Sequence, residues 1–291
     1  MIYTLWKRGI KLKDRTKYFA YPYLLWIILF IVFPSFLVLL YSMTTKQSNG
    51  LTTIQFTLEN FRKFFNPLYI NILWDSIYLA AVSTVICLIL GYPAAYIISK
   101  AHLSKRNTLL FLCILPMWMN MLLRTYAWMT ILGNNGILNN LFAFLGLPTF
   151  NMLYTRGATV MGMVYNFLPF MILPIYTALS KMDNGILEAA DDLGANRYIK
   201  FRKIILPLSM PGVISGIIMV FMPAVSTFII PQLLGGNKNM MIGNLIEKLF
   251  ILNGDWNFGS SISIIMMIII LISMSIMNKF DIDKEGGARL W

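Results

Sequence analysis

Charged residues are scarce in this chain. Only 12% of its 291 residues are Asp, Glu, Lys or Arg, whereas 58% are hydrophobic and the mean hydropathy is +0.68. A soluble domain carries about a quarter charged residues, so this composition leaves too little polar surface for a water-facing globule. We therefore predict an integral membrane protein. Because one membrane-spanning helix needs about 20 apolar residues, the length allows roughly six spans and no large additional domain.

Residues that bind metals are equally few. The chain has one histidine, His102, and two cysteines, Cys87 and Cys113, which both fall inside apolar segments. They cannot form a Cys/His metal cluster, and the pattern HExxH does not occur. We expect no metal site and no disulfide, with both cysteines serving as small packing residues. The phosphate-binding pattern GxxxxGK[ST] is also missing from the sequence, so the chain alone is not expected to hydrolyse ATP.

Long apolar runs predict an all-α membrane domain of six helices. The predicted spans are 21–43, 73–99, 108–132, 158–179, 208–234 and 260–277. The first follows a basic arm, residues 1–20, but it is too long for a signal peptide and no small-residue cleavage site follows it, so we interpret it as a retained span. A core of five spans, 73–277, and a tail, 278–291, complete the chain.

Basic residues are distributed unevenly between the two sides that these spans define. Seventeen Lys and Arg residues lie on the side that holds both ends of the chain, and five lie on the other side. Basic loops near span ends are retained in the cytoplasm, so both termini are predicted to be cytoplasmic. The net charge of +12 therefore indicates topology and contact with anionic lipid, and no nucleic-acid partner is expected.

Loops and prolines point to a pathway through the membrane. The outer loops 44–72, 133–157 and 235–259 are long enough to pack as short helices or to have a function of their own. Eight prolines within the spans suggest bent helices around a pathway. They are Pro34, Pro93, Pro116, Pro169, Pro174, Pro211, Pro223 and Pro231. Since no internal repeat is visible, the chain is expected to form half of that pathway.

The most charged segment is the predicted cytoplasmic loop 181–207. Asp183 or Asn184 can cap a short amphipathic helix in this loop, and Gly194 can end the helix. A lipid-bound interfacial helix is one interpretation. The first half of the loop is acidic, however, and anionic lipid would repel it. A protein partner is therefore favoured.

The same loop carries a family resemblance. Glu188-Ala189-Ala190, then Gly194 after three residues, then Ile204-x-Leu206-Pro207 after nine match the EAA loop of ABC importer permeases without a gap. Further motifs are similar to the spermidine/putrescine permeases of that family. They are GYPAAY at 91–96, LPxW at 115–118, RTYAW at 124–128, IPQLLGG at 230–236, MIGN at 241–244 and DWNFG at 255–259.

The resemblance implies a type I (MetI-like) permease in the bacterial inner membrane. Such a subunit forms the translocation path with a second homologous permease and receives cargo from an extracytoplasmic binding protein. A pair of cytoplasmic ATPases, which hold ATP and Mg, would dock on the EAA loop, and no cofactor is expected in this chain. The predicted ATPase-coupling residues are Glu188, Ala189, Ala190, Asp192, Leu193, Gly194 and Pro207.

The implied cargo, a polyamine, is a flexible polycation that carboxylates and aromatic faces can bind. The candidate path residues are Asp75, Trp118, Arg124, Tyr126, Trp128, Tyr165, Phe228 and Asp255. The aromatic residues can also be read as interfacial belt or packing residues, and Asp75 as a solvated helix end. Arg124 would repel a polycation unless it is paired, and the alternative is that it snorkels to the outer lipid heads.

Other functions have less support. The EAA loop also occurs in permeases for ferric ion, thiamine, sulfate and molybdate, so the same architecture with another small solute stays open. An ion-coupled carrier should show ionisable residues at mid-span, whereas the acidic residues here lie mainly in loops and span ends. An intramembrane enzyme would need paired acids, a Ser/His set or a metal motif within the spans, and the sequence has none. We therefore expect no enzymatic activity.

Overall fold

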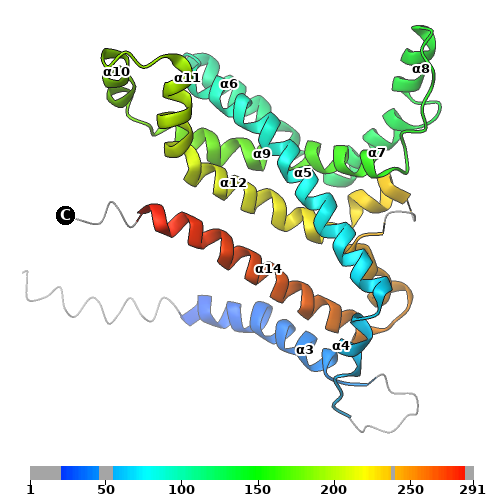
Figure 1. The fold of residues 1–291 in the computed structure, drawn as a ribbon. Coiled ribbons are helices and arrows are strands. Elements are labelled where there is room, and N and C mark those ends of the chain that lie inside the picture. The colour runs from blue at the N-terminus through cyan, green and yellow to red at the C-terminus, as the bar shows by residue number, and fades with distance from the viewer. Residues whose placement is uncertain (1–20, 46–54, 237–239, 286–291) are drawn as a thin grey trace, which may run out of the picture. The chain divides into compact units, whose positions relative to one another are not determined.

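The computed structural model describes residues 21–45, 55–236 and 240–285, with side chains except at 184 and 277–285. These residues are helical nearly throughout, and the strand-type pairing among them is one isolated bridge between Thr44 and Phe56 (Figure 1). The prediction of an all-α fold is confirmed. The predicted basic arm, 1–20, and the end of the predicted tail, 286–291, lie outside the described residues.

Five helices are long and apolar enough to cross a membrane, and a bent pair supplies a sixth span if it is counted as one. The five are Tyr21–Ser42, which ends in α3 (Phe33–Ser42); α5 (Pro67–Lys100); α9 (Arg156–Ser180); Arg197–Ser226, which ends in α12 (Leu206–Ser226); and Trp256–Ile276, the first part of α14 (Trp256–Glu285). The predicted spans 21–43, 73–99, 158–179 and 260–277 each overlap one of them. Short helices lie in the three loops that are predicted to be outer ones: α4 (Glu59–Phe64), α8 (Ile137–Phe144) and α13 (Ile242–Glu247).

The predicted third span, 108–132, is wrong as a single helix. It divides into α6 (Leu103–Ile114) with the 3-10 turn η2 (Leu115–Trp118), and α7 (Met121–Leu132). The segment Leu103–Trp118 is bent by 92° against Met121–Phe144, which begins with α7. Pro116 lacks an amide hydrogen, which weakens the α-helical pattern there. Met119 is extended, and the side chain of Asn120 accepts the Leu122 amide at 2.8 Å, as an N-cap does. Hydropathy averages over such a break and cannot show it.

The predicted fifth span, 208–234, is displaced toward the N-terminus. Helix is continuous from Arg197 to Ser226 and stops where Thr227 becomes extended. Just beyond the stop, the Phe228 carbonyl accepts the Asn244 side chain at 2.7 Å as well as the Gln232 amide at 3.1 Å. A separate five-residue segment, η4 (Pro231–Gly235), follows.

Wide π turns lie beside Pro34 and Pro231, two of the predicted helix-bending prolines, and beside Pro207 of the coupling loop. The segment η1 (Ile28–Val32) precedes Pro34, η3 (Phe201–Ile205) precedes Pro207, and η4 begins at Pro231. A π turn accommodates a residue that cannot donate its backbone hydrogen bond, so these turns follow from the proline positions. A further π segment is η6 (Lys248–Leu252).

The chain forms two compact units. One contains the described residues up to Phe65 together with Leu249–Met267, and the other contains Asn66–Lys248 and the residues from Ile268 onward. In the second unit, α9 packs against both α5 and α12, which also pack against each other. Small residues allow this close approach, since Ala80 and Ala95 of α5 are fully buried and Gly216 of α12 faces Met171 of α9.

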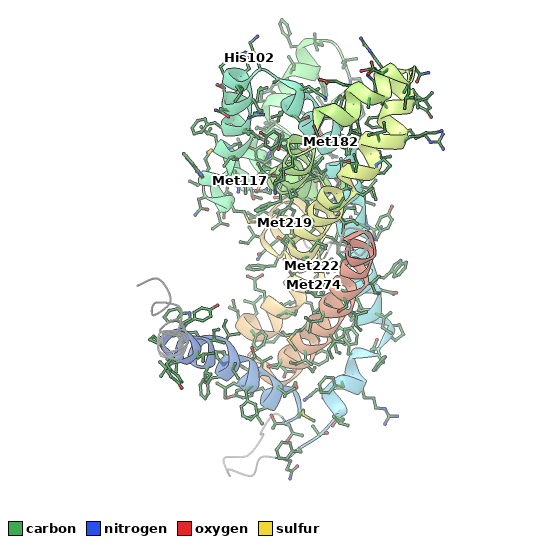
Figure 2. The ribbon with its side chains drawn as sticks, turned by 90° about the vertical axis from the view of Figure 1, so that its left-hand side faces the viewer. His102, Met117, Met182, Met219, Met222 and Met274 are labelled. Carbon is green, nitrogen blue, oxygen red and sulfur yellow. The ribbon has the colours of Figure 1, made fainter. Side chains whose placement is uncertain are left out.

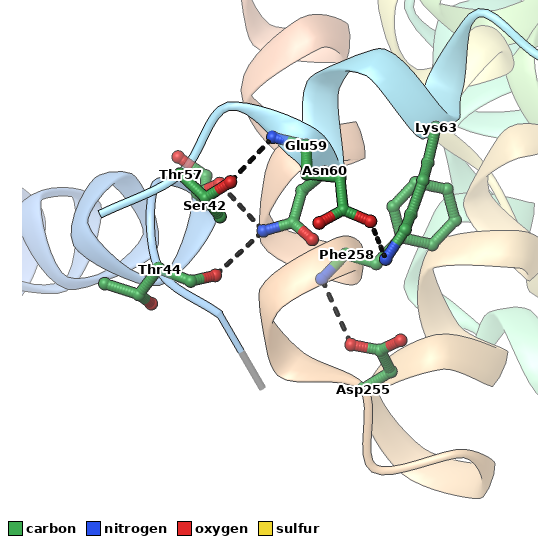
Figure 3. A network of polar contacts seen from close by, with 8 residues as sticks. All are labelled: Ser42, Thr44, Thr57, Glu59, Asn60, Lys63, Asp255 and Phe258. Carbon is green, nitrogen blue, oxygen red and sulfur yellow. Dashed lines mark hydrogen bonds and ion pairs between the residues drawn. The ribbon is translucent and has the colours of Figure 1, made fainter. Parts of the chain in front are cut away.

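In the first unit, two asparagines hold the end of the first span. Asn60 of α4 donates to the carbonyls of Ser42 and Thr44 at 3.2 and 2.8 Å (Figure 3). Asn257 of α14 donates to the carbonyls of Tyr41 and Thr44 at 3.0 and 2.9 Å. A helix leaves its last four carbonyls unpaired, and these amides supply the missing donors.

Candidate coupling loop and translocation path

The predicted helix of the charged loop is present as α10 (Asn184–Asp192). Asp183 caps it, since its side chain accepts the Gly185 amide at 2.9 Å. Gly194 has a φ of +75°, and a β-carbon placed on it would meet no atom within 4 Å. The glycine is therefore required by the backbone conformation that ends the helix and not by lack of space. Both the predicted cap and the predicted end are confirmed.

One side of α10 packs on the chain and the other is open. Ala190 is buried, and Leu187 lines a small cavity together with Tyr96, Met182 and Ile205 (Met182 is labelled in Figure 2). Glu188, Ala189 and Asp192 are exposed, and Leu193 is 88% exposed. An apolar side chain this exposed at the end of a helix is suited to contact another protein.

The second half of the loop leads directly into a span. Asn196 caps α11 (Arg197–Lys200) by accepting the Ile199 amide at 2.8 Å. Lys200 forms an ion pair with Asp191 of α10, which links the two short helices. The chain then continues through η3 into α12, with Pro207 as the second residue of α12. The loop and the span α12 are thus parts of one continuous segment of the chain.

Two of the predicted path residues meet. The rings of Trp128 on α7 and Tyr165 on α9 are edge to face, with centroids 5.3 Å apart. Trp118 is 74% exposed and contacts Phe111 of α6 with centroids 5.6 Å apart. Tyr126 and Phe228 are also exposed in the chain. Exposed aromatic faces of this kind can contact a cation, although the same side chains also suit a membrane interface.

Asp75 has a partner that the sequence did not reveal. Nη2 of Arg156 donates to both carboxylate oxygens of Asp75, at 3.0 and 3.1 Å. Both side chains are partly exposed, so the pair adds little stability by itself. The next residue, Ser76, is buried and accepts the Ile242 amide at 2.7 Å. Asp75 and Ser76 therefore connect α5 to α9 and α13.

Arg124 is 9% exposed and lies on α7. Its Nε and Nη1 atoms are buried and have no hydrogen-bond partner among the described residues. A buried guanidinium without a counter-charge is costly. No acidic side chain among the described residues pairs with Arg124, although a cationic cargo that passes Arg124 would require one.

A family comparison decides the identity of the chain. The family described as "Binding-protein-dependent transport system inner membrane component" matches residues 88–281. The chain belongs to this family. Its predicted inner-membrane location is thereby confirmed, and, as a transport permease, it is a non-catalytic subunit.

Named relatives of this permease cover most of its length. The spermidine/putrescine transport system permease protein PotB of Haemophilus influenzae is 44% identical over 241 residues, which are 82% of this chain and 84% of that protein. PotB of Escherichia coli K12 is 39% identical over 246 residues, 84% of this chain and 90% of that protein. A crystal structure of a bacterial ABC transporter involved in the import of alginate matches with a TM-score of 0.80 at 17% identity, covering 96% of this chain and 98% of that one. The type I importer fold is confirmed.

Asp255 belongs to the first compact unit, whereas the other predicted path residues of the permease belong to the second. Its Oδ1 atom accepts the Phe258 amide at 3.2 Å at the start of α14 (Figure 3). A carboxylate in this position satisfies free amides of the first helical turn, which gives Asp255 a structural role of its own.

The described residues contain no group of three or more His, Cys, Asp or Glu that could hold a metal ion. Cys87 is buried, Cys113 is partly buried, and both are free thiols. The residues that sequence analysis missed are Tyr92, Tyr96 and Phe201, and Phe201 contacts each of the two tyrosines where α5 meets η3. Phe201 is more than one hundred positions from both tyrosines, which left no signal in the sequence.

Proposed function

We propose that the chain is the transmembrane permease subunit of an ATP-driven polyamine importer. The observation that carries the proposal is the similarity to two spermidine/putrescine permeases, which extends over more than four fifths of this chain. The coupling loop supports the same function, since it forms a capped helix with an open face. The cargo would be spermidine, putrescine or both.

In this proposal, the energy for transport comes from ATP hydrolysis by a pair of cytoplasmic ATPases. Each would receive an exposed helix such as α10 in a groove, with Leu193 as the apolar contact and Glu188 and Asp192 as polar contacts. ATP and Mg would be held by those partners. When the ATPase pair closes, the docked helix would move as a rigid body and carry α12 with it, so that the path opens to one side at a time.

The path itself would lie between this chain and a second homologous permease, and an extracytoplasmic binding protein would deliver the cargo. Both termini of this chain would then be cytoplasmic, in agreement with the distribution of Lys and Arg. Trp118, Tyr126, Trp128, Tyr165 and Phe228 would offer aromatic faces to the cation.

A second candidate cargo is supported by one observation. Arg124 is buried with two nitrogen atoms that lack a partner in the described chain. An anion such as sulfate or molybdate would supply the missing acceptor, whereas a polyamine would not. The same importer architecture with an anionic cargo is therefore the alternative to test.

The test is the ATPase activity of the full complex in nanodiscs, assembled with its ATPase, the second permease and the binding protein. Spermidine, putrescine, thiamine, ferric ion, sulfate and molybdate are compared. We expect spermidine or putrescine to stimulate hydrolysis and Glu188→Ala to abolish the stimulation. Glu59→Ala, which alters an exposed acid outside the loop, is the matched control and should retain stimulation.

Three outcomes would change this proposal. Stimulation by sulfate or molybdate alone would show that the cargo is an anion and would leave the proposed mechanism unchanged. A complex that assembles with no ATPase would contradict the proposed function itself, and full coupling in Glu188→Ala would remove α10 as the docking helix.

A further inference from the structure

Three aromatic rings join the coupling loop to a span from which it is distant in the sequence. Phe201, the first residue of η3, lies edge to face with Tyr92 and Tyr96 of α5. The ring centroids are 5.8 and 6.2 Å apart, and both interplanar angles are 88°. Edge-to-face rings resist sliding because the positive edge of one ring faces the negative face of the other.

A hydrogen bond fixes the same part of α5 at a second point. The hydroxyl groups of Tyr92 and Ser209 are 2.9 Å apart, and Ser209 is fully buried in α12. Phe201 begins the π turn, in which the Leu206 amide donates to the Phe201 carbonyl, and Ser209 follows the turn in α12. Tyr92 therefore contacts both the start of the irregular turn and the helix after it.

These contacts join two helices at positions where the regular backbone hydrogen bonding of each helix is interrupted. On α5, Pro93 stands between Tyr92 and Tyr96 and removes a backbone donor from the helix interior. On the other side, η3 is a π turn, which makes weaker and wider backbone contacts than an α-helix. Without side-chain contacts across them, these two turns would bend independently. The rings and the hydroxyl pair hold them together.

Elsewhere, Leu187 of α10 and Tyr96 of α5 line the same small cavity, so part of the space between the loop and α5 is open. The ion pair between Asp191 and Lys200 connects the two short helices to each other and leaves α5 untouched. Movement of α10 can therefore reach α5 most directly through Tyr96, Phe201 and Tyr92.

We propose that Tyr92, Tyr96, Phe201 and Ser209 form a clamp that transmits the movement of the coupling loop to α5, so that α5 and α12 move as one body. The inference rests on the proposed function, because it concerns how ATP hydrolysis is coupled to transport. The clamp residues are positioning residues and touch neither cargo nor ATP. Through the clamp, a displacement at the loop reaches α5, whose opposite half carries Asp75.

The test is the number of cargo molecules transported per ATP hydrolysed by the complete complex in proteoliposomes. Phe201→Leu removes both ring contacts, and we expect this ratio to fall by about fivefold or more, the lower range of measured couplings between sites. The basal hydrolysis rate and the KM for the cargo-loaded binding protein should stay unchanged. Phe201→Tyr keeps the ring and should retain the wild-type ratio.

The matched control is Phe142→Leu. It removes an edge-to-face contact of similar geometry, with Phe150 at 6.2 Å and 89°, from the region of α8, at the other end of the second unit (Figure 1). Its ratio should equal that of the wild type. If Phe201→Leu fails to assemble, Tyr92→Phe serves instead, since it removes only the hydroxyl group, and the ratio should then fall by about twofold or more.

A purely structural role gives a different result. Loss of folded complex lowers transport and hydrolysis together and leaves their ratio unchanged, and an unchanged ratio in Phe201→Leu, or in Tyr92→Phe where that variant replaces it, overturns the proposal. Failure of the proposed function is seen separately, as a wild-type complex that neither spermidine nor putrescine stimulates. In that case the ratio of transport to hydrolysis is measured with whichever solute of the panel stimulates hydrolysis. A lower ratio in the variant still supports the clamp, and an unchanged ratio still contradicts it.

Discussion

Replacing Gly212 by alanine should loosen the contact between α9 and α12. A β-carbon at this position would lie 2.6 Å from Cβ of Ala178, 2.7 Å from the carbonyl oxygen of Pro174 and 3.2 Å from Cα of Ile175. Real β-carbons do not approach other atoms to less than 3.0 Å. Two of these three groups belong to the α9 backbone and cannot rotate away. The helices must therefore separate.

The expected magnitude follows from two opposing effects. Alanine is favoured over glycine inside a helix by about 1 kcal/mol. An extra methyl group in a close-packed interior costs about 1–3 kcal/mol, and the upper value applies here because backbone atoms block the site. The net destabilisation should be about 2 kcal/mol. The double variant Gly212→Ala with Ala178→Gly should recover part of it, because the contact with the Pro174 carbonyl persists.

The assay is equilibrium unfolding in mixed micelles of dodecyl maltoside and SDS, followed by tryptophan fluorescence. Gly157→Ala in α9 is the matched control, since its β-carbon would meet only Oγ1 of Thr155 at 3.7 Å. This variant should be as stable as the wild type or more stable by up to about 1 kcal/mol. Equal stability of the two variants would refute the packing argument.

Three further predictions concern buried polar groups. Asn139→Leu should destabilise α8 and the residues that follow it by about 3 kcal/mol, because Asn139 is 2% exposed and bonds to both backbone groups of Phe150. Proteolysis between residues 133 and 155 should accelerate, and an unchanged rate would contradict this. Asn257→Ala should lower the melting temperature of the complex, because the carbonyls of Tyr41 and Thr44 each lose a donor, at 3.0 and 2.9 Å. A constant melting temperature would show that the remaining donors, such as Asn60, are sufficient. Arg124→Met should raise stability in the SDS assay by about 1 kcal/mol or more, since it removes an unpaired buried charge; lower stability would reveal a partner for the guanidinium.

The coupling loop could be predicted in detail because its structure is local. Asp183 caps its helix through an amide two residues away, and Gly194 ends it through its own backbone conformation. Both effects act within one or two helical turns, so the order of residues contains them. The same holds for the four spans that hydropathy placed on observed helices.

Contacts between distant segments could not be predicted. The partner of Asp75 is Arg156, which is 81 positions away, and the partners of Phe201 are on α5. Polar and aromatic side chains at helix ends have several possible partners, and only the packed fold selects one. For Arg124, the sequence indicated a costly charge and two ways to compensate it, and the described chain shows neither a paired acid nor an exposed guanidinium.

The third and fifth spans, which differ from the prediction in form and in bounds, do so in a related way. The third breaks after Trp118, and the fifth stops before Phe228, so each break adjoins a predicted path residue. Beyond the breaks, α7 and η4 pack against each other. Irregular backbone at membrane depth persists only where protein buries it or where it lines a water-filled cavity, because lipid cannot satisfy free carbonyl groups. Two such segments in contact, bordered by exposed aromatic residues, are suited to line a path between two permeases. The difference between the spans predicted from hydropathy and the observed helices at these positions therefore supports the proposed location of the path.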